Sequence, residues 1–97
     1  DPYAALEAIH KVMATNGLLI IETHLDLVSL ERPAMALYAN GCNNDVTNFT
    51  GPNRAAVECL LKWAGFRDIA FQGGINLDRW PDLHKVNLAR GAFHARK

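Results

Sequence analysis

The stretch Asn16-Gly17-Leu18-Leu19-Ile20-Ile21-Glu22 decides the fold of this 97-residue chain. Asn16-Gly17 is typical of the end of a helix, because glycine readily adopts the left-handed backbone that closes one. Four consecutive apolar residues, 18–21, then predict a strand buried on both faces, as in a parallel sheet. Glu22-Thr23-His24 marks the polar carboxyl end of that strand. We therefore expect an α/β protein with strand 18–21 at the centre of its sheet.

Two helices are predicted around this strand. Asp1-Pro2 places a capping carboxylate before a proline, and apolar residues at spacings of three and four extend the first helix from about Pro2 to Asn16. The second begins at Pro52 and ends at Ala64-Gly65, with one apolar and one charged side. The order helix, glycine, strand thus occurs twice.

Two further strands are predicted after the second helix. The first contains Phe66, Ile69 and Phe71, and Gly73-Gly74 then predicts a loop or turn. The final strand is expected over 85–95, with a bulge near Arg90-Gly91. These strands are too few to cover a strand as apolar as 18–21 on both edges and both faces. Either a second chain supplies the cover or these residues are the C-terminal half of a larger sheet.

Residues 25–51 form a long insert between strand 18–21 and the second helix. Connections above about 12 to 15 residues are usually functional or disordered. This one leaves the carboxyl end of a strand, which is where open α/β sheets bind ligands. We expect a short helix over 33–38 within it and a ligand-binding surface around it.

Composition excludes several classes of function. Ten basic and ten acidic residues balance, which argues against a basic surface for nucleic acid or anionic membranes. The longest unbroken apolar run is far short of the roughly 20 residues that span a bilayer, and the chain opens without a targeting pattern, so we predict a cytoplasmic protein. Cys42 and Cys59 are too few for a disulfide framework. The histidines lack ligand spacing, so no metal site is predicted, and Gly73-Gly74 lacks the context of a nucleotide-binding loop.

Polar residues at the strand end and in the insert are candidate substrate contacts. Glu22 could bind substrate or act as a base if burial raised its pKa, or it could be an ordinary strand-end residue. Thr23 and His24 lie beside it in the sequence. The insert and the helix start add donors, acceptors and an aromatic face suited to a polar ring, namely Tyr38, Asn48, Asn53 and Arg54. Asparagines that form turns would explain much of the same composition.

Arg90 lies in a stretch otherwise rich in small and apolar residues. An unpaired charge in such a strand is costly, which favours a carboxylate or phosphate partner. The alternative is an arginine that faces solvent from one side of the strand.

Three segments together resemble the end of class I S-adenosylmethionine-dependent methyltransferases. They are Asn16-Gly17-Leu18-Leu19-Ile20-Ile21-Glu22-Thr23, then Ala64-Gly65-Phe66-Arg67-Asp68-Ile69, then Arg90-Gly91-Ala92-Phe93-His94-Ala95-Arg96-Lys97. The opening Asp1-Pro2-Tyr3-Ala4-Ala5-Leu6 is similar to the segment after the family's fourth strand. The resemblance is nearest to the branch that includes tRNA wobble-uridine carboxymethyltransferase. It covers most of the chain except the insert and the loop at about 73–84.

The resemblance implies the C-terminal half of one Rossmann-like domain over 1–97, made of a helix, strand 5, the insert, a helix and an antiparallel strand 6/7 hairpin. It implies transfer of a methyl or related one-carbon group to a small-molecule or tRNA uridine acceptor. The cofactor would be S-adenosylmethionine or its carboxylated form, bound mainly by residues upstream of this chain, so these residues alone are expected to be inactive. Arg90 matches the arginine that contacts the added carboxylate of the cofactor, and Tyr38-Ala39 matches a Tyr-Ala in the family's insert. No residue is assigned as a catalytic base.

A second hypothesis comes from another class of protein. The uncovered strand 18–21 also fits a non-catalytic α/β binding or assembly module that completes its sheet with a partner chain. The partner would be a second copy, giving a homo-oligomer, or another polypeptide. For the enzyme, the missing N-terminal half would supply the same cover.

Overall fold

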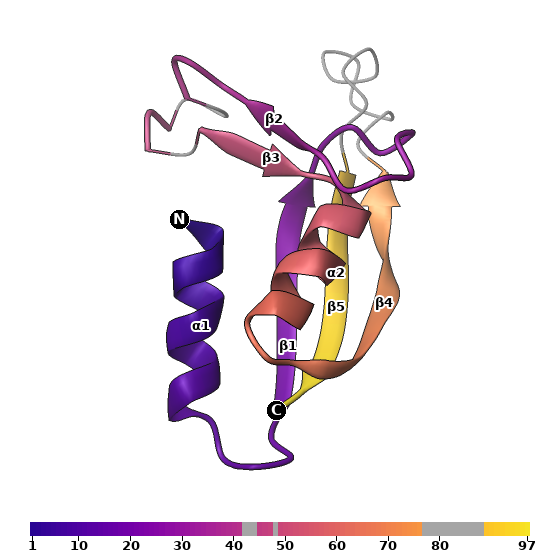
Figure 1. Cartoon of the computed structure of the whole chain (residues 1–97). Helices are drawn as coiled ribbons and strands as arrows, with labels where there is room; N and C mark the ends of the chain where they lie inside the picture. The colour runs from indigo at the N-terminus through magenta and orange to yellow at the C-terminus, as the bar shows by residue number, and fades with distance from the viewer. Residues whose placement is uncertain (42–44, 48, 77–88) are drawn as a thin grey trace.

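The computed structural model describes residues 1–41, 45–47, 49–76 and 89–97. It confirms a small α/β domain (Figure 1). Along the chain the elements are α1 (Pro2–Val12), β1 (Leu18–Leu25), β2 (Met35–Leu37), β3 (Thr50–Pro52), α2 (Arg54–Trp63), β4 (Arg67–Asn76) and β5 (Ala89–Arg96). None of the helices in the described part of the chain is long and apolar enough to span a membrane.

The main sheet has three strands in the order β1-β5-β4. β5 is antiparallel to both neighbours, so β1 and β4 run parallel to each other on either side of it. The prediction of a central β1 is wrong for the described residues: β1 forms an edge of this sheet, and β5 is its centre. β1 is also longer than predicted, because Glu22, Thr23 and His24 continue its pairing with β5.

Both helices pack on one face of this sheet. Leu19 and Ile21 of β1 point into the core on that face. Leu18 and Ile20 point the other way and are 46% and 61% exposed, so the expected burial of β1 on both faces is wrong here. We call the second face the open face; it carries Leu18, Ile20 and Glu22 of β1, Ala70 of β4, and Arg90, Ala92 and His94 of β5.

The start of α1 is capped as its sequence predicts, but its end differs. The Asp1 carboxylate accepts hydrogen bonds from the backbone N–H groups of Tyr3 and Ala4. The helix ends at Val12 rather than at Asn16, because the chain turns there and the Gly17 N–H donates to the Ala14 carbonyl. Asn16 itself has a φ of 63°, which is the left-handed backbone that asparagine tolerates.

The second helix begins two residues later than predicted. Pro52 is the last residue of β3, and the side chain of Asn53 caps α2 by accepting from the Ala56 N–H. The predicted end is confirmed, since α2 stops at Trp63 and Gly65 follows with a φ of 104°. A side chain at Gly65 would meet the His10 ring of α1 at 2.9 Å, so this glycine also allows the two helices to approach.

β2 and β3 form a two-stranded antiparallel arm that lies beyond the carboxyl end of β1 (Figure 1). The short helix predicted over 33–38 is therefore wrong. The segment is extended instead, because its backbone pairs with residues 50–52 and the Ala34 carbonyl accepts from the Asn53 N–H.

Gly73-Gly74 continues β4 and does not form the predicted loop or turn. The register of β4 against β5 shifts between Phe71 and Gly74, which marks a β-bulge whose extra residue lies on β4. The bulge was predicted on the neighbouring strand β5, near Arg90-Gly91. Gly74 is required there, because a Cβ would lie 2.0 Å from the Arg90 carbonyl oxygen. β5 begins at Ala89 among the described residues; the predicted start of this strand at 85–88 lies outside them.

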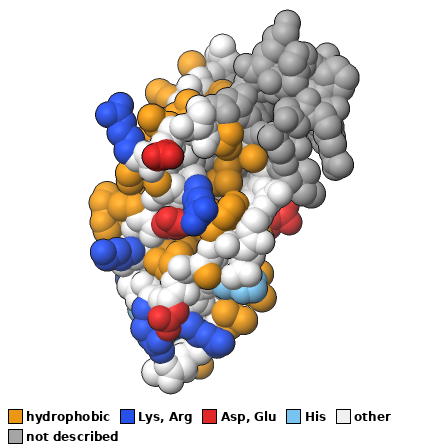
Figure 2. Space-filling view, turned by 90° about the vertical axis from the view of Figure 1, so that its right-hand side faces the viewer, with side chains coloured by type: hydrophobic (Ala, Val, Ile, Leu, Met, Phe, Trp, Pro, Cys, Tyr) orange, Lys and Arg blue, Asp and Glu red, His pale blue; other side chains and the backbone are white. Residues whose placement is uncertain are grey.

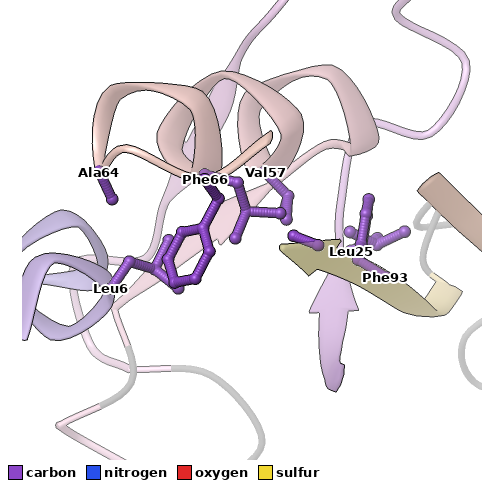
Figure 3. Packing of buried hydrophobic residues seen from close by; sticks show 8 residues of the cluster. Leu6, Leu25, Val57, Ala64, Phe66 and Phe93 are labelled. Atoms are coloured by element: carbon purple, nitrogen blue, oxygen red, sulfur yellow. The ribbon is translucent and has the colours of Figure 1, made fainter. Parts of the chain in front are cut away.

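The core lies between the two helices and the sheet (Figure 3). Figure 3 shows Leu6 of α1 and Phe66 turned toward each other, with Val57 of α2 and its C-cap residue Ala64 beside them. Phe93 of β5 is fully buried at the sheet side of this cluster. It also packs against the ring of Phe71 on β4, at 5.1 Å between ring centroids.

We expect Phe93→Ala to lower the free energy of unfolding by about 3 to 5 kcal/mol, since it removes a fully buried ring and leaves a cavity. The measurement is chemical denaturation followed by circular dichroism. Val12→Ala is the control, because Val12 is 84% exposed and its loss should change stability by at most about 0.5 kcal/mol. Equal effects of the two substitutions would contradict the packing described above.

Candidate functional site at the carboxyl end of the first strand

Glu22 and Arg90 pair across the open face. β1 and β5 are in a register that sets Glu22 opposite Ala92 and His24 opposite Arg90. The Arg90 Nε donates to Glu22 Oε1 at 2.7 Å, so both readings that the sequence left open hold in part: Arg90 has a carboxylate partner and also faces solvent from one side of its strand. The side chains are 46% and 63% exposed, and such surface pairs contribute only about 0 to 1 kcal/mol. An anionic ligand could therefore compete with Glu22 for Arg90.

His24 and Asp26 form a second, buried pair next to the first. His24 Nε2 lies 4.0 Å from Asp26 Oδ2, and the two side chains are 12% and 7% exposed. Neither of these two atoms has a hydrogen-bond partner in the described structure. Burial lowers the pKa of His24 below its usual value of 6.5; the Asp26 carboxylate opposes this shift and the Arg90 guanidinium adds to it.

Asp26 also joins β1 to the root of the arm. Its N–H donates to the Pro52 carbonyl at 2.9 Å, and its Oδ1 accepts from the Leu27 N–H at 2.7 Å. A Cβ on Gly51 would lie 2.9 Å from Asp26 Cβ and 3.1 Å from both Asp26 Oδ2 and Tyr38 Cε2. The absence of a side chain at Gly51 thus lets Tyr38 and Asp26 close around the root of the arm, and it brings Tyr38 to the same end of the sheet as His24.

The side-chain amide of Asn53 is fully hydrogen-bonded to backbone groups. Its Oδ1 accepts from the N–H groups of Ala34 and Ala56, and its Nδ2 donates to the carbonyls of Leu30 and Arg32, all at 2.7–3.1 Å. The side chain is buried and uses both amide atoms in these bonds. Asn53 therefore holds the insert against α2 and has no donor left for a ligand.

Arg54 and Arg90 line one cavity of about 370 Å³. The Arg54 guanidinium lies 4.4 Å from the centroid of the Phe71 ring, and its Nε donates to Glu58 Oε1 at 2.7 Å. The remaining lining is apolar or glycine, from Leu25, Val28, Phe71, Gly74 and Ala89. Phe71 is paired with Phe93 on the helix-covered face, whereas the side chain of Arg90 points to the open face, so only Arg54 brings a guanidinium group to this side of the sheet.

The other predicted site residues are not brought together in the same way. Thr23 lies on β1 on the face of Ile21 and Leu25, and its hydroxyl donates to the neighbouring His24 carbonyl at 3.4 Å. Asn48 lies outside the described residues, as do Cys42 and His84. Cys59 is a half-buried free thiol. Within 1–41, 45–47, 49–76 and 89–97, no three metal-ligating side chains gather.

Two residues of the site were missed from the sequence, Asp26 and Phe71. The spacing His24-x-Asp26 after an apolar strand is a usable signal, because residues two apart in extended chain point to the same side. Phe71 was expected only as part of a strand, and in the structure it packs on Phe93. Its second role beneath Arg54 depends on the bulge in β4, which has no sequence signal beyond Gly73-Gly74.

The surface agrees with the balanced composition. Figure 2 shows acidic and basic side chains interspersed with apolar ones over the visible described atoms, with no large block of one sign. Arg54 and Arg90 are themselves each paired with a carboxylate, Glu58 and Glu22 respectively.

A scan against models of known protein families and a search of curated proteins found no match to this chain.

We expect Asn53→Ala to destabilise the protein by about 2 to 4 kcal/mol, because it removes a buried side chain that caps α2 and bonds the Leu30 and Arg32 carbonyls. Asp1→Ala is the matched control: it removes an exposed cap and should cost about 1 kcal/mol. Thermal unfolding of both variants provides the comparison. If Asn53→Ala cost no more stability than Asp1→Ala, the role of Asn53 in holding the insert against α2 would be refuted.

Proposed function

We propose that this chain is the C-terminal part of an S-adenosylmethionine-dependent methyltransferase. It would transfer a methyl or related one-carbon group to a small-molecule or tRNA uridine acceptor. In such a reaction the acceptor's nucleophilic atom bonds to the transferred carbon, the bond from carbon to the sulfonium sulfur breaks, and the sulfur keeps the electron pair. Catalysis then depends mainly on positioning and on the exclusion of water.

The single observation that carries the proposal is the strand arrangement. β1, α2 and β4 form a strand, helix and parallel strand, and β5 lies between the strands, antiparallel to both. The resemblance implies a last strand of this orientation closing the sheet, preceded by a strand, an insert and a helix. The order and direction of the elements support it across the described chain.

The unequal cover of the sheet gives further support. Both helices lie on one face, while the open face exposes Leu18 and Ile20 and the outer edge of β1 has no strand beside it among the described residues. Exposed apolar residues next to an unpaired strand edge usually mark a surface that another element covers. In this proposal the upstream half of the enzyme covers it and supplies most of the cofactor-binding residues.

Arg90 is the proposed contact to a carboxylated cofactor, and Arg54, Tyr38 and Glu22 lie around the proposed acceptor side. Arg90 is held on the open face by the exposed Glu22, a partner that a ligand carboxylate could replace, whereas Arg54 lies over Phe71 on the helix-covered face. His24, whose pKa is lowered by burial, lies two residues from Glu22 on the same strand and is the proposed proton acceptor. The full bonding of the Asn53 amide makes it a scaffold residue in this scheme.

We expect the intact protein to bind S-adenosylmethionine or its carboxylated form in isothermal titration calorimetry and to transfer the labelled carbon to an acceptor. Arg90→Met should weaken binding of the carboxylated donor by about 10- to 100-fold, since it removes a charge-assisted hydrogen bond, and should leave S-adenosylmethionine binding unchanged. Arg96→Met is the control, because Arg96 is an exposed arginine on the same strand. The proposal fails if neither donor binds and no carbon is transferred.

The alternative is a non-catalytic assembly module, and the unpaired edge of β1 favours it. Pairing of this edge with a second copy would cover Leu18 and Ile20 and extend the sheet. On this alternative, Ile20→Lys should convert a dimer to a monomer in analytical ultracentrifugation, while Val46→Lys, at an exposed position in the insert, should not. A monomeric wild-type protein would exclude it.

A further inference from the structure

Two buried polar atoms lie together at the carboxyl end of β1. His24 Nε2 is 4.0 Å from Asp26 Oδ2. Neither atom has a hydrogen-bond partner among the described residues, and both are shielded from water. The other oxygen of the carboxylate, Asp26 Oδ1, accepts from the Leu27 N–H at 2.7 Å. Oδ2 is therefore the oxygen left to act on the imidazole.

The carboxylate determines which ring nitrogen of His24 carries a hydrogen. A separation of 4.0 Å is too long for a hydrogen bond, but charges and dipoles interact several-fold more strongly in a buried site than in water. A lone pair on Nε2 would be repelled by Asp26 Oδ2, whereas an N–H at that position is attracted to it. This holds for the neutral and for the protonated ring. Asp26 thus favours a hydrogen on Nε2 in both charge states, and Nδ1 is the nitrogen left to gain or lose a proton.

The exposure of the His24 ring agrees with this assignment. The side chain is 12% exposed although Nε2 is buried, so its accessible surface belongs to other atoms. Nδ1 makes no hydrogen bond to the described residues and is not among the buried unpaired atoms, so it is the ring nitrogen that reaches solvent. Glu22, two residues earlier on β1, is bonded to Arg90 at 2.7 Å, which leaves Asp26 as the carboxylate beside the ring.

We propose that Asp26 is a positioning residue that fixes a hydrogen on His24 Nε2, so that His24 receives the acceptor's proton at Nδ1. The inference rests on the proposed methyl transfer and narrows its acceptor to a protic group, an O–H or N–H. An electron pair of that oxygen or nitrogen bonds to the transferred carbon, and the carbon–sulfur pair stays on sulfur. The acceptor's proton moves to Nδ1, and the resulting imidazolium lies beside the Asp26 carboxylate.

The substitution Asp26→Asn is expected to invert this arrangement with little change in shape. The Leu27 N–H still requires an acceptor, so the amide oxygen of the new side chain takes the place of Oδ1. The amide NH₂ group then takes the place of Oδ2 and points a donor toward Nε2, which favours a hydrogen on Nδ1 instead. Nδ1 thereby loses its lone pair, and His24 cannot accept the proton there.

NMR of the imidazole nitrogens in the intact protein tests the assignment, because their chemical shifts report which nitrogen carries the hydrogen. We expect Nε2–H in the wild type, with Nδ1 as the nitrogen whose signal changes most when the ring is protonated. Asp26→Asn should convert the neutral ring of His24 to Nδ1–H. Asp68→Asn is the matched control, because Asp68 is 68% exposed on β4 and should leave the His24 tautomer unchanged.

Transfer kinetics of the same proteins provide the second readout. Asp26→Asn should lower kcat by on the order of 100-fold and leave KM for the acceptor unchanged, since only the proton transfer is affected. Asp68→Asn should change neither constant.

The outcomes separate this inference from the proposed function. A wild-type ring with its hydrogen on Nδ1, or a tautomer that Asp26→Asn does not invert, would overturn the inference whether or not carbon is transferred. An unchanged kcat in the inverted variant would overturn it as well. The wild-type spectrum can refute the assignment even if Asp26→Asn fails to fold. The expected tautomers without any carbon transfer would instead contradict the proposed function, and with it the role of Nδ1 as proton acceptor.

Discussion

The simultaneous pairing of β5 with β1 and β4 is the constraint on which the rest of the structure depends. β5 is the only described strand with a partner on both edges, and its Phe93 and Ala95 are almost completely buried beneath the helices. Gly91 makes this possible at the upper end of the strand, because a Cβ there would lie 2.7 Å from both Leu25 and Phe71. Without that glycine, the two outer strands could not pack their side chains against each other over β5.

The register that this packing fixes also creates the site. Side chains on the helix-covered face form the core, so the alternate residues of the same strands must point to the open face. His24 and Arg90 are direct cross-strand partners as a result, and Glu22 reaches Arg90 diagonally. The arm then covers the end of β1 through the Asp26–Pro52 hydrogen bond. A single arrangement of strands thus brings a surface ion pair and a buried His–Asp pair to one end of the sheet.

The local elements were largely predictable from the sequence, whereas their tertiary partners were not. Asp1, Gly17 and Gly65 carry capping and turn signals that depend only on neighbouring residues, and both helices and the strand at 18–21 lie close to where those signals predict. The apolar run of β1 could not indicate that one of its faces stays open, because burial depends on which elements pack nearby. Met35–Leu37 became a strand because residues 50–52 pair with it, a contact across the insert that no local pattern encodes. The candidate site was likewise predictable only in part. Glu22, His24 and Arg90 were identified from their positions in the predicted strands. Only the fold shows that the Asn53 side chain bonds four backbone groups and that Asp26 is buried beside His24.

The central claim is that this sheet belongs to a larger enzyme that uses S-adenosylmethionine. Native mass spectrometry of the protein purified from its natural source tests this most directly, because one spectrum reports both the mass of the polypeptide and any retained small molecule. We predict a chain much heavier than 10.7 kDa that carries S-adenosylmethionine, its carboxylated form or its demethylated product. A mass equal to these 97 residues, with no ligand bound, would contradict the claim.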